Sequence, residues 1–289
     1  VQLLIDRQVG DGVYLKVKVE EYPRLDNIVI SGNDEFSEED VRTKIGLIKG
    51  QILRNTDFNR ITRKLQKEYE KEGYLLANVA FSTKLVNPKE NRADLIVELD
   101  EGPEVSIESI SFTGNTAFDD DDLRGAMDET SQSSWWKFWS SARFDRENYE
   151  KDKELLVKMY RGEGYLDAVV VRDSIWYSDD KERMYIDITV DEGQRAYIRN
   201  VIWKGNTVYP DSLLASRLGF QSGDVFDETR FQENLRGNPD QTDVASLYLD
   251  NGFLRFFAQD DRVRVAPDSV DVVINVIENT KSRIGHVLI

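Results

Sequence analysis

The chain has no cysteine and one histidine among its 289 residues. The lack of cysteine excludes disulfides, thiol catalysis and thiolate metal sites, and it leaves the cellular compartment open. The one histidine, His286, falls on a segment patterned like a strand, where an ordinary surface role is favoured over that of a catalytic base. No Ser-His-Asp, Cys-His or phosphate-loop pattern can be assembled from the remaining residues. The sequence therefore predicts no enzyme, no cofactor and no metal site.

Positive charge is also scarce, because 38 lysines and arginines face 54 acidic residues and leave a net charge of −16. Proteins that bind nucleic acid need a basic stripe, and the sequence has none, so we expect no nucleic-acid partner. Anionic lipid headgroups would repel the chain except at a local basic and aromatic patch. No apolar run reaches the roughly 18 residues that a membrane-spanning helix needs, and no signal peptide is visible.

One pattern occurs three times, in LDNIVISGNDEF (25–36), IESISFTGNTAF (107–118) and IRNVIWKGNTVY (198–209). Apolar residues lie four and two positions before each Gly-Asn pair, and this alternation predicts a strand with one buried face. The glycine supplies the positive φ needed to leave the strand. We therefore assign a structural role to Gly32, Gly114 and Gly205.

Two helix starts follow each of these strands. An aromatic residue four positions after the glycine, with a capping residue and then an aliphatic residue, predicts a hydrophobic staple at the first start. At the second start the staple is formed by Phe144 and Tyr149 around Asp145, and by Phe226 and Phe231 around Asp227. In the first unit the second start is less regular, with Leu53 and Phe58 as the staple and Asn55 or Thr56 as the expected cap.

Each second helix is predicted to end in a similar phrase, KEYEKEGYLLANV (67–79), KMYRGEGYLDAVV (158–170) or SLYLDNGFLRFFA (246–258). The glycines within these phrases are typical of left-handed residues that end a helix, so we assign a structural role to Gly73, Gly164 and Gly252. Two strands then close each unit, and alternation is clearest in the last of them, at 95–99, 186–190 and 272–276. In the third unit, NLRGNPDQ (234–241) should break the second helix in two.

The fold class is therefore α+β, built from tandem β-α-α-β-β repeats of about 80–90 residues. Each repeat should form a mixed three-stranded sheet with two helices on one face and the third strand parallel to the first. The short joints between repeats predict semi-rigid articulation. We expect both ends of the chain to be cut from a longer array. The predicted domains are 1–21 (end of a preceding unit), 22–102, 103–193 (with an insertion at 131–141), 194–279 and 280–289 (first strand of a following unit).

The repeats resemble POTRA domains in their element order, their Gly-Asn strand, the "EGY" phrase and the joints LDEGPE (99–104) and VDEGQR (190–195). Tandem units, one with a Trp-Trp insertion, are similar to the second to fourth POTRA domains of the BamA family, the outer-membrane β-barrel assembly proteins. This resemblance covers nearly the whole chain. It implies a non-enzymatic scaffold on the periplasmic side of the bacterial outer membrane. Such a scaffold receives unfolded outer-membrane β-barrel proteins, docks accessory assembly lipoproteins and continues into a C-terminal membrane barrel outside this sequence.

Two alternatives are considered. POTRA regions of autotransporter-assembly or two-partner-secretion transporters have fewer units, and the number of units here argues against them. A periplasmic hydrolase would instead use acidic side chains, and it predicts a cleft with paired carboxylates of shifted pKa. The acidic run DDDD (119–122) suggests Ca²⁺, but it lacks the glycine and the later glutamate of an EF-hand loop. Carboxylates at a helix N-terminus are also stabilised by the helix dipole alone.

The second strand of each unit should have only one neighbour, which leaves a row of backbone groups open to an added strand. Main-chain hydrogen bonds give affinity without requiring one sequence, which suits a protein that accepts many clients. The alternative is that these side chains simply divide between core and solvent. The candidate contact residues are Val79, Phe81, Val169, Val170, Val171 and Arg172.

The stretch SQSSWWKFWSS (131–141) lies in a loop between the two helices of the second unit. From the strand-end glycine to the first aromatic of the second helix there are 26 residues in the first and third units, but 35 in the second. Tryptophan with a few cations is typical of a membrane interface or a protein contact. The alternative is that the rings cap their own helices or pack on the next unit. The residues concerned are Trp135, Trp136, Lys137, Phe138 and Trp139.

Overall fold

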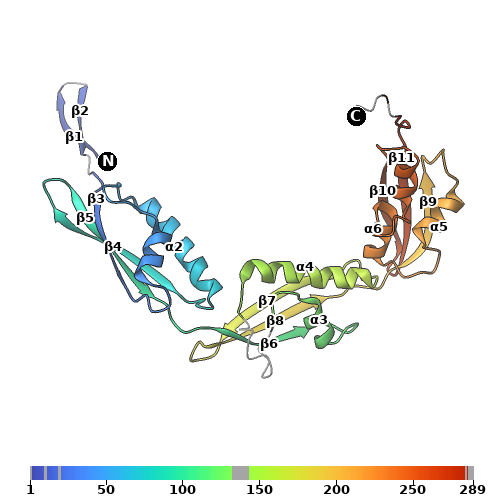
Figure 1. Cartoon of the computed structure of the whole chain (residues 1–289), viewed down its shortest axis with the longest axis horizontal. Helices are drawn as coiled ribbons and strands as arrows, with labels where there is room; N and C mark the ends of the chain where they lie inside the picture. The colour runs from blue at the N-terminus through green and yellow to red at the C-terminus, as the bar shows by residue number, and fades with distance from the viewer. Residues whose placement is uncertain (1, 10–11, 19–20, 132–142, 284, 286–289) are drawn as a thin grey trace. The chain divides into compact units, whose positions relative to one another are not determined.

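The computed structural model describes residues 2–9, 12–18, 21–131, 143–283 and 285. In this part of the chain, three sheets of three strands form, together with one two-stranded hairpin (Figure 1). The hairpin pairs β1 (Gln2–Val9) with β2 (Gly12–Lys18) in antiparallel fashion. Residues 13–19, VYLKVKV, alternate as a strand does, and β2 falls on them, whereas no pattern predicted β1.

The first repeat has the predicted order of elements. Its sheet order is β3-β5-β4, with β3 parallel and β4 antiparallel to the central β5. The elements are β3 (Arg24–Ser31), α1 (Glu38–Ile45), α2 (Asn55–Lys71), β4 (Asn78–Asn87) and β5 (Arg92–Asp100).

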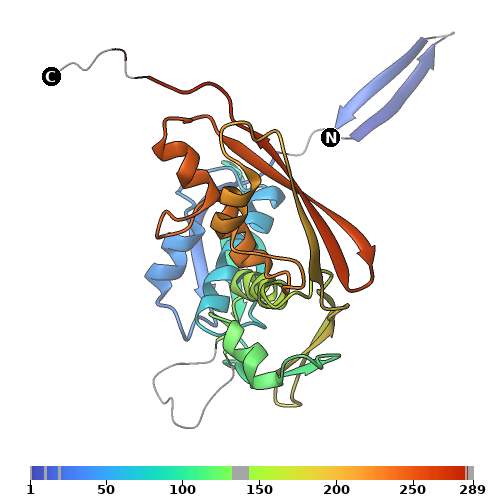
Figure 2. The same ribbon diagram turned by 90° about the vertical axis from the view of Figure 1, so that its right-hand side faces the viewer.

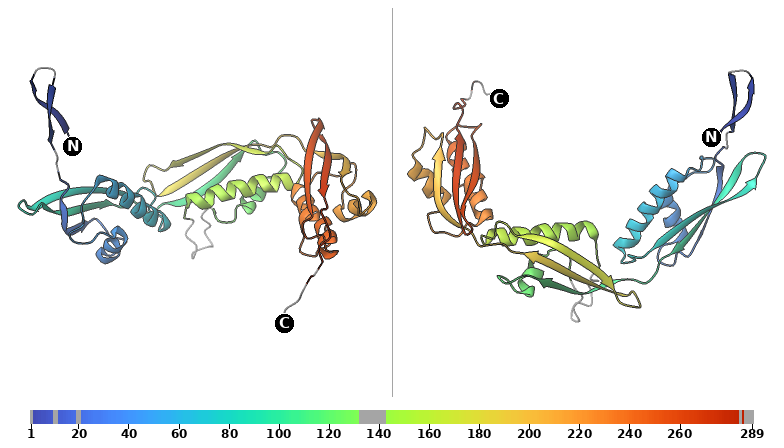
Figure 3. Two further views of the ribbon diagram at one scale, coloured as in Figure 1. Left: turned by 90° about the horizontal axis from the view of Figure 1, so that it is seen from above. Right: turned by 180° about the vertical axis from the view of Figure 1, so that it is seen from behind.

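The middle repeat follows the same plan, with sheet order β6-β8-β7. The long helix α4 runs along one face of this sheet, as both views of Figure 3 show. The elements are β6 (Ser106–Thr113), α3 (Asp120–Ala126), α4 (Arg146–Gly162), β7 (Val169–Tyr177) and β8 (Arg183–Asp191).

The third repeat has sheet order β10-β11-β9, and its helices lie on one side of the β10–β11 ribbon (Figure 2). Its second helix is broken into α6 and α7, as the Gly and Pro of residues 234–241 predicted. The elements are β9 (Tyr197–Lys204), α5 (Asp211–Leu218), α6 (Glu228–Arg236), α7 (Val244–Asp250), β10 (Phe257–Ala266) and β11 (Ser269–Ile277).

Each core lies between a sheet and its helices. In the first repeat, every second residue of β5 is buried, and α2 buries Ile61, Leu65 and Tyr69 at helical spacing. Full burial of an aliphatic side chain of this kind contributes about 1.5–3 kcal/mol. The third repeat has its own cluster, centred on Phe226, Phe231 and the inner face of β11. The predicted α+β architecture is therefore confirmed, because the strand and helix periodicities mark the faces that pack.

Most predicted helix starts are also found. Ser37 caps α1 by accepting a hydrogen bond from the Asp40 amide at 3.1 Å, and Asp227 caps α6 in the same way. The prediction for α2 was wrong. This helix begins at Asn55 itself, with Arg54 as its N-cap residue and no side-chain cap. The Arg54 carbonyl accepts from the Asp57 amide at 2.9 Å, so the turn closes through the backbone one residue earlier than predicted.

Of the last ten residues, 280–283 and 285 are described and form no strand. Half of the predicted opening strand of a following unit (280–289) falls on residues outside the description, so this strand stays a prediction. No helix in the described ranges is long and apolar enough to cross a membrane.

Candidate functional site

The second strands β4, β7 and β10 each lie at one edge of a sheet, as the predicted strand order requires. The first strands β3, β6 and β9 lie at the opposite edges, which were not among the predicted contact sites. Each sheet therefore has two edges to consider, and the two are not covered equally.

The start of the first-strand edge is covered by the link between the helices. In the first repeat, the Leu25 amide donates to the Gln51 carbonyl at 2.8 Å, and the Gly50 amide donates to the Leu25 carbonyl at 2.7 Å. In the third repeat, the Ile198 amide and carbonyl make the equivalent bonds with Asp224 and Gly223, both at 2.8 Å. A new strand therefore cannot pair along the whole of β3 or β9.

The second-strand edge is more open. Along β4, the described backbone pairing is with β5 alone, from Asn78 opposite Asp100 to Asn87 opposite Arg92. Val79 is buried, and Phe81 stacks on Phe58 with ring centroids 5.3 Å apart, so both side chains anchor the strand to its core. What β4 offers a partner is therefore its backbone rather than these two side chains.

The middle repeat has a groove along β7. The groove has a volume of about 950 Å³ and is lined by α4, by residues 168–173 and by α6 of the third repeat. Val169 and Val171 are 45% and 61% exposed, Val170 is half-buried and Arg172 is exposed. This run of three valines is the most apolar stretch of exposed edge among the residues predicted to bind clients.

The rim of this groove is charged. Lys153 on α4 donates to Asp173 on β7 at 2.9 Å and also pairs with Glu150 at 2.9 Å. The hydrogen bond from Lys153 holds the pKa of Asp173 below its ordinary value, although burial opposes this shift. Both residues of this ion pair line the groove, so the pair joins the helix to the strand within its wall.

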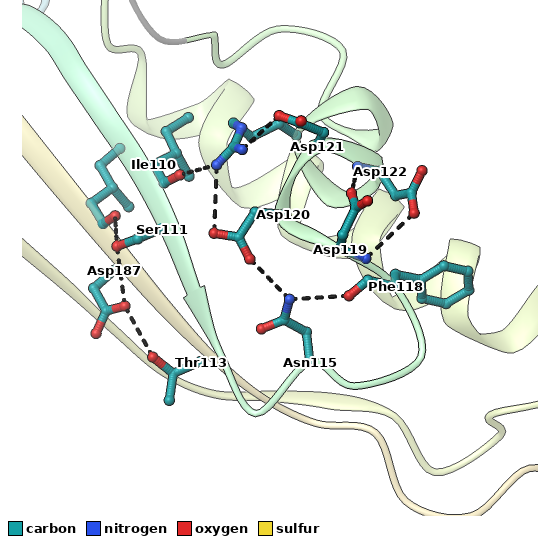
Figure 4. Close-up of polar contacts among 12 residues, drawn as sticks. Ile110, Ser111, Thr113, Asn115, Phe118, Asp119, Asp120, Asp121, Asp122 and Asp187 are labelled. Atoms are coloured by element: carbon teal, nitrogen blue, oxygen red, sulfur yellow. Dashed lines mark hydrogen bonds and ion pairs between the residues drawn. The ribbon is translucent and has the colours of Figure 1, made fainter.

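The side chains of the acidic run at 119–122 make contacts at the start of α3 (Figure 4). Asp119 and Asp122 form a reciprocal capping box. Asp120 accepts a hydrogen bond from Asn115 at 2.9 Å, and Asp121 pairs with Arg124 at 2.7 Å. The described residues contain no group of three or more His, Cys, Asp or Glu side chains that could hold a metal.

In the middle and third repeats, a buried glutamate comes directly after the last strand. Glu278 accepts hydrogen bonds from the Thr207 amide and hydroxyl, from the Val208 amide at 2.9 Å and from the Tyr248 hydroxyl at 2.9 Å. Glu192 repeats these contacts in the middle repeat, with Tyr160 as the phenol at 3.0 Å. We call this arrangement the glutamate clamp, because it ties the last strand, the Gly-Asn turn and the second helix together.

Burial alone would raise the pKa of Glu278, but the hydrogen bonds from Thr207, Val208 and Tyr248 outweigh it and hold that pKa below its ordinary value. Burial and the bond to the carboxylate raise the pKa of Tyr248. The clamp was not predicted from the sequence. Its signals are a tyrosine four residues before each "EGY"-type glycine and a glutamate at the start of each joint.

The structural glycines do more than permit a turn. A Cβ on Gly32, whose φ is +75°, would lie 2.0 Å from the Leu99 carbonyl oxygen, so the strand end and β5 approach too closely for any side chain.

Gly164 ends its helix with φ of +92°, and its carbonyl accepts from the Ala196 amide at 2.8 Å. This second bond holds the joint that follows the middle repeat. Gly73 and Gly252 accept corresponding bonds from Val105 and Ser282, and Gly114 and Gly205 repeat the close approach of Gly32.

Several predictions lie outside the described residues. The insertion residues Trp135, Trp136, Lys137, Phe138 and Trp139 are among these, as is His286. Their predicted contacts with a membrane or partner stay predictions. For the hydrolase alternative, the described carboxyl groups with a resolved shift all have a lowered pKa, whereas a general acid needs a raised one.

The fold and its edges define a tandem array of small β-α-α-β-β domains. The family model described as "POTRA: Surface antigen variable number repeat" matches residues 23–102, 105–193 and 196–279. The chain therefore belongs to the POTRA family.

Among curated relatives, outer membrane protein assembly factor BamA of Neisseria meningitidis is 27% identical over 203 residues, which is 69% of this chain and 25% of that protein. BamA of Neorickettsia risticii is 25% identical over 276 residues, covering 94% of this chain and 36% of that protein. The predicted resemblance to POTRA domains of the BamA family is confirmed by these matches. The chain spans about a quarter to a third of these relatives' length.

Among solved structures, POTRA3-5 of Haemophilus influenzae BamA is 19% identical, with a TM-score of 0.44, covering 88% of this chain and 96% of that chain.

Proposed function

We propose that the chain is part of a non-enzymatic periplasmic scaffold for outer-membrane protein assembly. It receives unfolded outer-membrane β-barrel proteins by strand addition, docks accessory assembly lipoproteins and works beside a membrane barrel of the same protein. The observation that carries this proposal is the open edge of β7 beside a groove of about 950 Å³.

Strand addition suits this edge for two reasons. An edge strand presents unpaired N–H and C=O groups, and an extended chain of any sequence can satisfy them. The exposed side chains of Val169 and Val171 add apolar contact area for alternate residues of that chain. Affinity then comes from the backbone and from moderate apolar burial, so many different clients can bind.

The relatives support the wider setting. BamA proteins are described as outer membrane protein assembly factors, and this chain matches part of their length. We therefore assign the same task to the protein to which this chain belongs. The presence of three complete repeats favours this assignment over transporters with fewer POTRA domains.

Site-specific photo-crosslinking tests the proposal. A photoreactive phenylalanine derivative replaces Val171, and the chain is mixed with a urea-unfolded outer-membrane β-barrel protein diluted into buffer. We expect crosslinks at this position. A matched variant carries the same group at Lys151, an exposed residue on α4. Equal yields at both positions would contradict binding at the edge.

A pair of proline variants tests the strand mode itself on β4. Ser82 and Thr83 lie opposite Ile96 and Leu95, and adjacent residues of an antiparallel strand direct their N–H groups to opposite sides. Of Ser82→Pro and Thr83→Pro, one removes a bond to β5 and lowers the melting temperature. The other removes only an N–H group that points away from β5, so this variant should keep its melting temperature. It should also lose crosslinking to the unfolded protein from a photoreactive group placed on β4. Full crosslinking in both variants would exclude strand addition at this edge.

A further inference from the structure

The first strands of the three repeats differ at their outer edges. In the first repeat, Arg42 on α1 donates to the Ile28 carbonyl of β3 at 2.9 Å. In the middle repeat, Arg124 on α3 donates to the Ile110 carbonyl of β6 at 2.7 Å. Each arginine is ten residues after its Gly-Asn glycine, and each accepting carbonyl is four residues before it.

These arginines are held in place. Arg42 pairs with Glu38 at 2.7 Å, and Arg124 pairs with Asp121 at 2.7 Å. A guanidinium fixed in this way fills the acceptor position that an incoming strand would use. The link between the helices covers the start of β3, and the arginine covers its middle.

The third repeat has Ala215 where the other two have arginine. The carbonyl equivalent to those of Ile28 and Ile110 belongs to Val201, four residues before Gly205. Both β3 and β9 pair in parallel with their central strand, and both shift register near their start. By this equivalence, the Val201 carbonyl lies at the outer edge of β9. The described contacts give residues 200–204 pairing with β11 and no second strand.

The same stretch has two further features. The Nε1 of Trp203 is buried and has no hydrogen-bond partner among the described residues, and such a group costs about 1–3 kcal/mol. The equivalent residues Ile30 and Phe112 carry no such polar group. Ile202, beside Trp203, is 39% exposed. This edge therefore combines open backbone groups with an exposed aliphatic side chain, whereas the unpaired Nε1 of Trp203 lies in the buried core.

We propose that residues 200–204 of β9 form a second strand-accepting edge, which the first and middle repeats close with an arginine. Its occupant is an extended segment of unfolded polypeptide, because only an extended backbone offers alternating donors and acceptors at the spacing of a strand. The nature of this ligand rests on the proposed function, whereas the position of the edge does not. A chain bound at β9 would leave the β7 groove free for another segment.

The test places the photoreactive group at Ile202 and adds the same urea-unfolded β-barrel protein. Ala215→Arg installs the residue that closes the edge elsewhere. We expect it to lower the crosslinking yield at Ile202 by about two-fold to ten-fold, the equivalent of one net hydrogen bond. The yield at Val171 on β7 should not change. An unchanged yield at Ile202 would overturn the proposal.

A reciprocal variant keeps the test valid if Ala215→Arg does not fold. Arg42→Ala opens the edge of β3 and should raise crosslinking from Val29, which occupies the position equivalent to Ile202 and is 45% exposed. Failure of this increase would count against the proposal. Crosslinks at Ile202 that join two copies of this chain would replace the proposed ligand with a second copy. If the photoreactive group gives crosslinks at Ile202 but none at Val171, only the proposed β7 site would be contradicted.

Discussion

The first and third repeats share a fold, but they differ where the last strand meets the Gly-Asn turn. In the third repeat, Glu278 accepts from two backbone amides, a threonine hydroxyl and a tyrosine hydroxyl. In the first repeat, Glu101 accepts from one amide, that of Glu35 at 3.1 Å, and from the Tyr69 hydroxyl at 2.8 Å. The position of Thr207 is held there by Asp34, which brings a like charge instead of a donor.

The comparison separates the features that the repeats share from those that vary. The glycine of the Gly-Asn turn approaches the last strand closely in every repeat. The buried tyrosine recurs as well, and its ring centroid lies 4.9 Å from that of the aromatic residue after the turn in each repeat. The glutamate clamp varies in strength around them. The close approach of backbone to backbone is therefore common to the turns, and we expect the clamp to add more stability where it has more donors.

The largest expected effect comes from breaking what the two repeats share. Gly32→Ala would place a Cβ 2.0 Å from the Leu99 carbonyl oxygen, in addition to the strain of a positive φ. We expect a loss of about 3 kcal/mol or more in the unfolding free energy of the first repeat. Gly50→Ala is the matched control, because φ is +88° but nothing lies within 4 Å of the added atom. It should cost about 1–2 kcal/mol. Amide hydrogen exchange of β5 measures both, and equal losses would exclude the close approach as the cause.

The second largest expected effect is a loss of stability that differs between the third and first repeats. Glu278→Gln removes the charge from a carboxylate with four donors and places an amide N–H among them. We expect the third repeat to lose about 2–3 kcal/mol. Glu101→Gln in the first repeat should cost about 1 kcal/mol or less, because fewer hydrogen bonds are lost. Urea unfolding with repeat-resolved hydrogen exchange compares them. A larger loss at Glu101 would reverse the ranking of the clamps.

Acid should weaken the clamp of the third repeat. The pKa of Glu278 in the folded state lies below its ordinary value of 4.5, so its contribution is complete above about pH 4.5. That contribution is lost as the pH falls through the lower folded-state pKa. Stability can be followed by the fluorescence of Trp203, with the other four tryptophans replaced by phenylalanine. Glu278→Gln should flatten this pH dependence, and a dependence that the variant retains in full would assign it to other groups.

The smallest effect would make the repeats alike. Asp34→Thr gives the first repeat the hydroxyl that Thr207 supplies in the third and removes a like charge near Glu101. We expect a gain of about 0.5–1 kcal/mol in the unfolding free energy. Asp34→Ala serves as the control, since it removes the charge without adding a donor. If the two variants stabilise equally, the hydroxyl contributes nothing.

Much of the fold could be predicted from local patterns. Alternation predicted β3, β6 and β9, and the spacing of aromatic and capping residues predicted most helix starts. The Gly and Pro of residues 234–241 predicted the break between α6 and α7. The wrong prediction of a capping residue at Asn55 or Thr56 also has a local cause, since a backbone turn at Arg54 takes the place of a side-chain cap.

The candidate edges were harder to predict. Strand order identified β4 and β7 as edge strands, but the covering of β3 by residues 50–53 and by Arg42 depends on residues distant from that strand in sequence. The clamp was missed for the same reason, since Glu278 and Thr207 are 71 residues apart. The groove beside β7 required α6 as a wall, which no periodicity within the middle repeat indicates.

The amino-acid sequence was enough to establish a tandem α+β array, because helix and strand periods, turns and caps depend on neighbouring residues. Folding alone decided which edges stay open and which are closed, because a free edge depends on what the rest of the domain places beside it. An arginine at position 42 and an alanine at position 215 look like unremarkable surface choices in the sequence. Their effects differ because each lies on a helix beside the first strand of its repeat. Arg42 donates a hydrogen bond to a strand carbonyl, whereas Ala215 has no donor to offer.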